Sequence, residues 1–521
     1  MRIRLAAALT AVLLTSCSES TPSPSPTGGV TSTGGAATGG IVSTGGEVAT
    51  GGSAMGGMTA TGGKSNTGGK IQTGGASAQG GNAATGGSAN TGGNTRPGGR
   101  DAGIVAATGG RRATDASTGS GGAEAGGSPA TGGMPSTGGV VAGSGGAMAG
   151  GTTENTGADC NATAAPMLSA KNPILPDPFK MHDGTRIASK SEWECRRNEI
   201  MKDIEKYEIG TKPEPPTVTA TFSGGKLSVV VTTSSGSITL SSTVTGSGSC
   251  VVIGMNRAST LVSGCTQVPF MHDQVVSYAN GGGSQNQSDP FYKVYPSLWK
   301  KIGNYNAWSW GISRLIDGIE KVKDQMKVDP TKIAVHGCSY AGKMALFGGA
   351  FDERVALTIA QESGGGGITS WRTSQDFTTR TGTNVEKIDN TNYAWFLSSM
   401  KSLDPYKLPH DHHELIAMIA PRAIIALGNP GYEWLGDESG YKSITAAAEV
   451  FKALGVPENI GYDFTGGHSH CSAASSQTAS VTAFANKFLK GQSANTAIAI
   501  KPSASNFNLT YTLDWTAPTL Q

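Results

Sequence analysis

The most informative stretch of the chain reads Ile333-Ala-Val-His-Gly337-Cys-Ser339-Tyr-Ala-Gly342-Lys-Met-Ala-Leu346. Its first three residues form an apolar run that predicts a short buried strand, and its last three begin a helical pattern. One serine therefore lies between two glycines at a sharp strand-to-helix turn. The glycines lack the Cβ atoms that would clash where strand and helix cross. The pattern predicts a nucleophile elbow that exposes the Ser339 hydroxyl, with the backbone N–H of Tyr340 facing a developing oxyanion.

A nucleophilic serine needs an acid and a base, and in this architecture both follow it along the chain. Glu362 stands where a predicted strand enters a glycine-rich loop, so its carboxylate can hold the Nδ1–H of a histidine. Glu433, in the loop after the predicted strand 423–427, is the alternative acid. For the base, His468 and His470 share one short loop, and chemistry alone does not choose between them.

The cysteines indicate where the protein works. Cys17 follows Met1-Arg-Ile-Arg4 and an apolar run that is too short to span a membrane as a helix. We interpret residues 1–17 as a lipoprotein signal peptide in which Cys17 is the lipid anchor. The other six cysteines are even in number, so paired disulfides are expected in an exported protein. Cys338 adjoins the serine and Cys471 adjoins His470, so a bridge between them would hold serine and histidine together.

Composition divides the chain. Residues 18–158 are rich in Thr-Gly-Gly and hold more than half of the 77 glycines, which predicts a disordered linker. Residues 159–492 are enough for a full core, with helix and strand alternating from about 305 to 490, as in an α/β sandwich. Residues 217–253 alternate Thr, Val and Ser and predict an antiparallel edge of a sheet. Residues 493–521 form a polar C-terminal tail with a strand-like run at 508–513.

Several functions are excluded or disfavoured. The net charge of +2, without a basic stretch, argues against nucleic acid as a partner. Neither a phosphate-binding loop nor a specific metal-ligand pattern occurs, so no cofactor and no metal are expected. The run His410-Asp-His-His-Glu414 lacks the spacing that places two imidazoles on one helix face, and it is interpreted as a helix start. Trp308 and Trp310 fall at helical spacing and are assigned to the core.

Taken together, the motifs resemble the glucuronoyl esterases of carbohydrate esterase family 15, the 4-O-methyl-glucuronoyl methylesterase-like enzymes. The resemblance covers about 160–490. It rests on Gly337-Cys-Ser-x-x-Gly-Lys343, Gln361-Glu-Ser-Gly364, His470-Cys471, the opening Trp193–Ile200 and the stretch Ala307–Asp317. The resemblance implies an α/β-hydrolase fold, a three-layer αβα sandwich with a largely parallel central sheet.

The resemblance also implies roles. Ser339 would be the nucleophile, Glu362 the triad acid and His470 the base. The family's disulfides map to Cys338–Cys471 and Cys160–Cys195, which leaves Cys250–Cys265 as a local pair.

Four positions bear on the substrate. Lys343 and Trp434 resemble the family's sugar-contacting lysine and tryptophan. Glu386 stands where the family tends to have glutamine, and Asn392 where it tends to have glutamate. Tyr340 replaces the arginine that helps to hold the oxyanion in the family, so one charged donor is missing.

The expected protein is an exported serine esterase, anchored by lipid to the cell envelope and monomeric. Its substrate would be an ester of (4-O-methyl)-D-glucuronic acid in glucuronoxylan or lignin–carbohydrate complexes. One alternative is an α/β-hydrolase esterase or peptidase acting on a different acyl substrate. The other is an inactive surface carbohydrate-binding relative.

Overall fold

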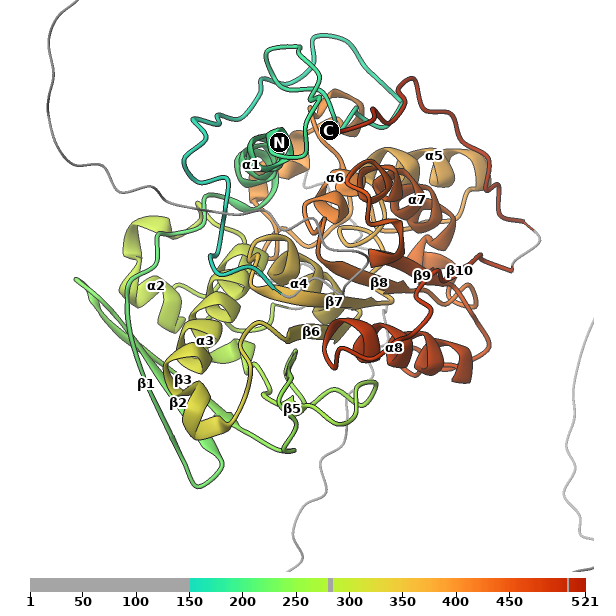
Figure 1. Cartoon of the computed structure of the whole chain (residues 1–521). Helices are drawn as coiled ribbons and strands as arrows, with labels where there is room; N and C mark the ends of the chain where they lie inside the picture. The colour runs from blue at the N-terminus through green and yellow to red at the C-terminus, as the bar shows by residue number, and fades with distance from the viewer. Residues whose placement is uncertain (1–149, 280–283, 504–505) are drawn as a thin grey trace, which may run out of the picture. The chain divides into compact units, whose positions relative to one another are not determined.

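The computed structural model describes residues 150–279, 284–503 and 506–521 (Figure 1). The predicted signal peptide, Cys17 and the predicted linker up to residue 149 lie outside the described residues. In the part of the chain that is described, no helix is both long and apolar enough to cross a membrane.

A seven-stranded sheet forms the centre of the domain, with strand order β10-β9-β8-β7-β6-β4-β5. All neighbouring strands that the structure describes in this sheet run parallel. The strands are β4 (Val251–Gly254), β5 (Thr266–Gln267), β6 (Ile333–Cys338), β7 (Val355–Gln361), β8 (Ala423–Leu427), β9 (Ile460–Asp463) and β10 (Ala499–Ile500).

Helices cover both faces of this sheet. The α-helices of the described residues are α1 (Glu192–Ile204), α2 (Pro290–Val294), α3 (Asn304–Met326), α4 (Tyr340–Ala350), α5 (Trp371–Thr381), α6 (His412–Ala417), α7 (Asp437–Ala453) and α8 (Ser475–Phe488). In Figure 1, α8 lies on one side of the sheet, and α4, α6 and α7 lie on the other. The arrangement is the three-layer αβα sandwich expected from the sequence.

The alternation of side chains along the buried strands produces two separate apolar layers. Val252, Ala334 and Ile425 point to the face that α8 covers and belong to one apolar cluster with Val481 and Phe484 of that helix. Their chain neighbours point to the opposite face and join the larger core, which includes the buried Trp308 and Trp310 of α3, as predicted. A central strand whose two faces are both covered must be apolar throughout, and this is why β6, β7 and β8 contain nearly continuous apolar runs.

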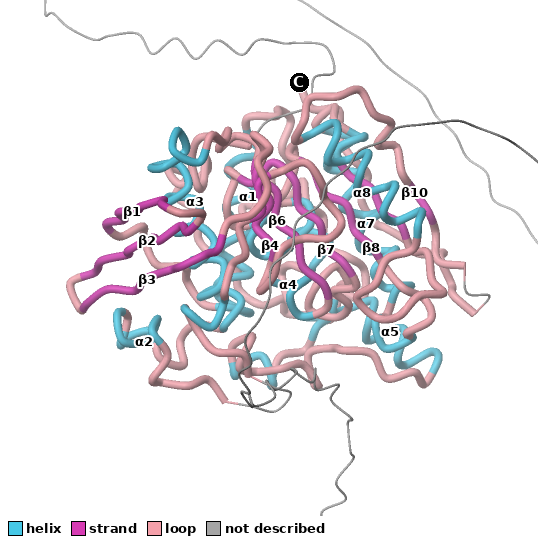
Figure 2. Tube along the Cα trace, turned by 90° about the horizontal axis from the view of Figure 1, so that it is seen from below, coloured by secondary structure: helices cyan, strands magenta, loops and turns pink. Residues whose placement is uncertain are grey.

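The prediction for residues 217–253 was wrong in one respect. The run does not form an edge of the main sheet. Instead β1 (Thr217–Ser223), β2 (Lys226–Thr233) and β3 (Gly236–Thr243) form their own antiparallel sheet, which Figure 2 shows beside the main one. Val229 and Val231 on its inner face are fully buried, because α3 packs against it. The last part of the run, β4, belongs to the parallel sheet.

The folded domain begins before residue 159. Gly150 N–H donates to Thr331 O (2.8 Å), and Gly151 N–H donates to Glu353 O (2.6 Å). Glu154 forms ion pairs with Lys212 (2.6 Å) and Arg314 (2.5 Å). Residues 150–158 are therefore part of the domain rather than of a linker. The ion pair between Glu154 and the buried Arg314 helps to hold this segment on the domain, and composition alone does not predict such a contact.

The C-terminal tail packs on the domain. β10 pairs with β9, and the predicted strand at 508–513 does not form. The tail is held by side chains instead: Trp515 Nε1–H donates to Leu175 O (2.8 Å), and the Tyr511 and Thr445 hydroxyls lie 2.7 Å apart.

Candidate active site

The predicted nucleophile elbow is present between β6 and α4. Ser339 has φ 60° and ψ −127°, a conformation that a residue with a side chain adopts only under strain. A Cβ atom at Gly337 would lie 2.0 Å from Ala341 O, and one at Gly342 would lie 2.3 Å from Gln361 O, so both glycines are required. The serine lies at the carboxyl edge of the sheet, where parallel α/β folds bind their ligands.

The predicted acid, Glu362, and the predicted base, His470, meet at the next strand end. Glu362 follows β7 directly and is 1% exposed. His470 Nδ1 donates to Glu362 Oε2 at 2.6 Å, and the Cys471 backbone N–H donates to Glu362 Oε1 at 3.1 Å. With its Nδ1 proton held by the carboxylate, His470 carries its free lone pair on Nε2, which is the tautomer that a general base needs.

The second histidine of the loop is engaged elsewhere. His468 Nδ1 lies 3.8 Å from Glu362 Oε1, too far for a hydrogen bond. Its ring instead contacts Asn429 Nδ2 (3.1 Å) and Thr465 O (2.9 Å). Of the two histidines, His470 alone hydrogen-bonds the Glu362 carboxylate.

Three disulfides are present, and one joins the elbow to the histidine loop. Cys338 and Cys471 are bonded across 133 residues with Cα atoms 5.6 Å apart. The other pairs are Cys160–Cys195 and Cys250–Cys265, so the pairing is the one that the resemblance implied. The sulfurs of Cys338 and Cys471 lie near His470, but disulfide sulfurs are not thiolate ligands, so this group is no metal site.

Backbone strain is concentrated around this site. Six non-glycine residues in the described ranges have positive φ, and four of them are Asn256, Ser339, Glu362 and Cys471. Three of the four are the elbow residue Ser339, the predicted acid Glu362 and Cys471 in the histidine loop. Such conformations persist only where the surrounding structure enforces them, and they cluster at functional sites.

The alternative acid, Glu433, occupies an exposed 3₁₀ turn (Glu433–Leu435) and makes no side-chain hydrogen bond with another described residue. A different carboxylate of the same loop lies near the site. Asp437, the first residue of α7, is buried, and its burial and then the nearby Glu362 raise its pKa to about 7. Sequence analysis missed Asp437, although an acidic residue in the first turn of a helix is a signal for a structured carboxylate.

Lys343 forms an ion pair with Glu386. Its Nζ lies 2.5 Å from Glu386 Oε2, and the other Glu386 oxygen accepts from Thr391 Oγ1 at 2.7 Å. The ammonium also lies 5.6 Å from the centre of the Trp395 ring. Lys343 is one helical turn after Ser339, so this ion pair flanks the elbow.

The remaining two predicted substrate contacts differ in exposure. Trp434 is 47% exposed, and its ring centre lies 4.9 Å from that of His470. Asn392 is buried, and its amide is used by the backbone: Nδ2 donates to Ala279 O at 2.8 Å, and Oδ1 accepts from Ala394 N–H at 2.9 Å. Trp434 is thus available to a ligand, whereas the Asn392 amide supports the loops around it.

The Tyr340 hydroxyl contacts His272. The oxygen lies 3.1 Å from His272 Nε2, and the ring packs against Tyr278 and Trp395 with centre distances of 4.6 Å and 5.9 Å. Burial, with a smaller effect of Tyr278, raises the pKa of Tyr340 to about 12, so the side chain is a neutral phenol at neutral pH. What Tyr340 offers an oxyanion is its backbone N–H.

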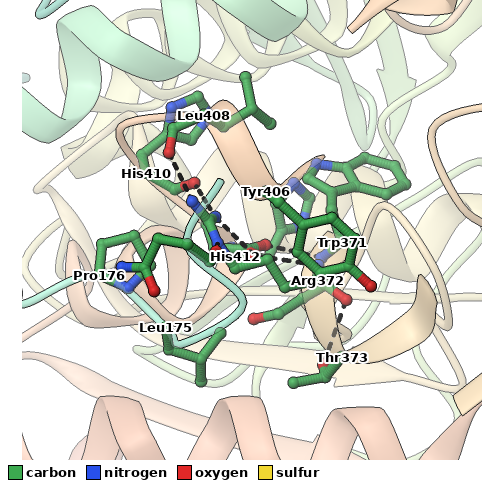
Figure 3. Close-up of polar contacts among 12 residues, drawn as sticks. Leu175, Pro176, Trp371, Arg372, Thr373, Tyr406, Leu408, His410 and His412 are labelled. Carbon is green, nitrogen blue, oxygen red and sulfur yellow. Dashed lines mark hydrogen bonds and ion pairs between the residues drawn. The ribbon is translucent and has the colours of Figure 1, made fainter. Parts of the chain in front are cut away.

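The His410–Glu414 run has a structural role, as predicted. Asp411 caps α6 in a capping box with Glu414. His410 and His412 each place Nε2 within 2.9 Å of the buried Glu208 carboxylate. Figure 3 shows how Arg372 supports the same loop by donating to the carbonyls of Leu408 (2.5 Å) and His410 (2.8 Å).

This buried cluster also fixes the end of the acid loop. His412 Nδ1 lies 2.6 Å from Gly367 O, and its Nε2 faces Glu208. Both partners are acceptors, so both ring nitrogens of His412 donate and the ring is a cation. Burial opposes that charge, but Glu208 outweighs burial and raises the pKa of His412. The loop that starts at Glu362 is therefore tied down at its far end.

Comparison with known proteins places this site in a family. A family model described as glucuronyl esterase, fungi, matches residues 227–455. A 4-O-methyl-glucuronoyl methylesterase of Hypocrea jecorina is 38% identical over 375 residues, which are 70% of this chain and 80% of that protein. One from Schizophyllum commune is 38% identical over 382 residues, 70% of this chain and 95% of that protein.

Solved structures of glucuronoyl esterases are also similar to this chain. The glucuronoyl esterase catalytic domain of Hypocrea jecorina has a TM-score of 0.62 and 37% identity, and the match covers 68% of this chain and 98% of that one. For the glucuronoyl esterase of Sporotrichum thermophile the TM-score is 0.63 and the identity 34%, with 69% and 100% covered. With identity above one third over at least 80% of each of these relatives, the chain belongs to the glucuronoyl esterase family of carboxylic ester hydrolases.

Proposed function

We propose that the protein hydrolyses esters of (4-O-methyl)-D-glucuronic acid in glucuronoxylan or lignin–carbohydrate complexes through a Ser-His-Glu triad. The observation that carries the proposal is the hydrogen bond from His470 to the buried Glu362, next to a serine on a strained elbow. The relatives named above are 4-O-methyl-glucuronoyl methylesterases. A variant of the Sporotrichum thermophile enzyme was solved in complex with methyl 4-O-methyl-β-D-glucopyranuronate.

In this mechanism Ser339 Oγ attacks the ester carbonyl while His470 Nε2 takes its proton. Glu362 orients the imidazole and stabilises the imidazolium, and the backbone N–H of Tyr340 donates to the oxyanion. The C–O bond to the alcohol then breaks, and His470 returns the proton to the leaving oxygen. Water attacks the acyl-enzyme by the same route in reverse and releases the uronic acid and free Ser339.

We further propose that the protein is exported and held at the cell envelope by a lipid on Cys17. The signal-like residues 1–17 support this, and the three disulfides fit an oxidising compartment. Metabolic labelling with a radioactive fatty acid tests it. Label should enter the wild-type protein and be absent from Cys17→Ser; equal labelling of both would refute the anchor.

A different acyl substrate is the second candidate, because Tyr340 and Glu386 change the surroundings of the elbow. Hydrolysis of benzyl D-glucuronate, measured beside p-nitrophenyl acetate, separates the two. The proposed function requires a much higher kcat/KM for the glucuronate ester. Ser339→Ala should abolish both activities and leave the far-UV circular dichroism unchanged. A preference for the acetate would favour the other acyl substrate, and full activity of Ser339→Ala would refute the serine mechanism.

A further inference from the structure

The oxyanion site of this chain lacks a charged donor on the elbow itself. Position 340 carries tyrosine, whose hydroxyl is engaged with His272. Lys343, one turn further on, is paired with Glu386. A tetrahedral intermediate on Ser339 would therefore meet one backbone N–H and no unpaired cation from α4.

The neighbouring strand brings a cation to the same edge of the sheet. β4 runs parallel to β6, and Gly254 is the register partner of His336. Met255 N–H extends the pairing by donating to His336 O at 2.8 Å. Arg257 and Ser339 each lie three residues beyond the Gly254–His336 pair. Adjacent strands are about 4.8 Å apart, so the turn that carries Arg257 and the elbow that carries Ser339 follow neighbouring strands at the same carboxyl edge.

The chain forms a tight turn between Gly254 and Arg257. A Cβ atom at Gly254 would lie 2.0 Å from Arg257 O, so the backbone folds back over the strand end. Asn256, directly before the arginine, has φ 63° and is one of the strained residues grouped around the site. In α/β-hydrolases a loop at the end of a neighbouring strand supplies the second oxyanion donor, a backbone N–H, so this loop lies where a donor is needed.

The Arg257 side chain is not committed to another role. It is exposed, and within the described ranges it forms neither an ion pair nor a side-chain hydrogen bond. Its charge acts on groups on both sides of the nucleophile. Burial lowers the pKa of His336 to about 4, and Arg257 adds to that effect. At Tyr340, where burial raises the pKa, Arg257 opposes the increase.

We propose that Arg257 is a catalytic residue whose guanidinium donates to the oxyanion formed on Ser339. It would supply, from the β4 loop, the charge that the family arginine supplies directly after the nucleophile. The inference rests on Ser339 as the nucleophile of the proposed function. It does not depend on which ester is cleaved, because every ester forms the same oxyanion.

The test is the steady-state kinetics of Arg257→Gln on p-nitrophenyl acetate and on benzyl D-glucuronate. Loss of an oxyanion donor should lower kcat about 100-fold on both esters with KM nearly unchanged, because the contact exists only in the transition state. Lys226→Gln is the matched control. It removes an exposed charge from strand β2 of the separate three-stranded sheet and should retain wild-type kinetics.

A second variant makes the result specific. Tyr340→Arg places the family's arginine on the elbow, and in the Arg257→Gln background it should restore kcat at least tenfold. In the wild-type background its gain should be smaller, because the oxyanion already has a charged donor. Circular dichroism of each variant shows whether the fold is retained.

Three results would overturn the proposal: kcat of Arg257→Gln within threefold of wild type on both esters, an effect on KM alone, or no hydrolysis of either ester by the wild type. An effect on the glucuronate ester alone would overturn it as well, and would make Arg257 a sugar contact. If the wild type cleaves only the acetate and Arg257→Gln lowers that kcat, the glucuronoyl function fails while the role of Arg257 stands.

Discussion

Replacing Glu362 by glutamine tests the triad most directly, and the geometry gives the size of the effect. The carboxylate accepts two hydrogen bonds, from His470 Nδ1 (2.6 Å) and from Cys471 N–H (3.1 Å). A glutamine has one oxygen for two donors. If its NH₂ group faces the ring, His470 is forced into the tautomer with Nε2 protonated, which cannot accept the serine proton.

If the glutamine oxygen faces the ring instead, its NH₂ group opposes the Cys471 N–H, and the imidazolium has no negative partner. Either arrangement should lower kcat by about 10⁴-fold, as a triad acid-to-amide change typically does. That is about 5.5 kcal/mol of transition-state stabilisation. The KM should change little, because the carboxylate is buried behind the histidine and is not a substrate contact.

The assay is hydrolysis of benzyl D-glucuronate from pH 5 to 9 by wild type, Glu362→Gln and Glu433→Gln, each checked for fold by thermal unfolding. Glu433→Gln is the matched control, because it makes the same chemical change in an exposed turn, and it should stay within about twofold of wild type. A larger loss for Glu433→Gln than for Glu362→Gln would refute the assignment of the acid.

Three further outcomes are expected. The fold raises the pKa of Asp437 to about 7, so the contribution of this group to folding stability falls as the pH rises from about 4 to 7. Asp437→Asn should therefore be thermally more stable than wild type at pH 8 but not at pH 4, and an equal difference at both pH values would contradict this. Replacing Cys338 and Cys471 together by alanine should lower the unfolding free energy by about 2–5 kcal/mol in denaturant titrations, and no loss would mean that the bridge does not hold the loops together. Glu386→Gln frees the Lys343 ammonium and should strengthen inhibition by the glucuronate anion severalfold at low salt, with an unchanged inhibition constant as the contrary result.

The elbow, the fold class and the order of the site residues along the chain were predictable, because local patterns encode them. A glycine on each side of Ser339 between a buried strand and a helix leaves few other structures possible. The choice of His470 over His468 was not available from local chemistry. The choice depends on which of the two rings reaches Glu362, more than 100 residues away in the sequence. Only the resemblance to the family pointed to His470.

What sequence analysis missed depends on contacts between distant segments. Alternating Thr and Val predict a strand, but they do not say which sheet it joins, and β1–β3 pair among themselves because α3 covers their inner face. Asp437 and Arg257 carry no motif of their own. Each becomes notable only when parallel pairing brings its loop to the carboxyl edge beside Ser339 or Glu362.

The exchanges at positions 386 and 392 can be understood as one linked change. Where the family tends to have glutamine and glutamate, this chain has Glu386 and Asn392, so the number of carboxylates is the same. The carboxylate at 386 pairs with Lys343, and the amide at 392 bonds only backbone groups. The lysine thus keeps a counter-ion, and the charge around the sugar-side residues is preserved. The arginine expected after the nucleophile is absent at position 340, and Arg257, which forms no ion pair within the described ranges, is the cation on which we propose that the rate depends.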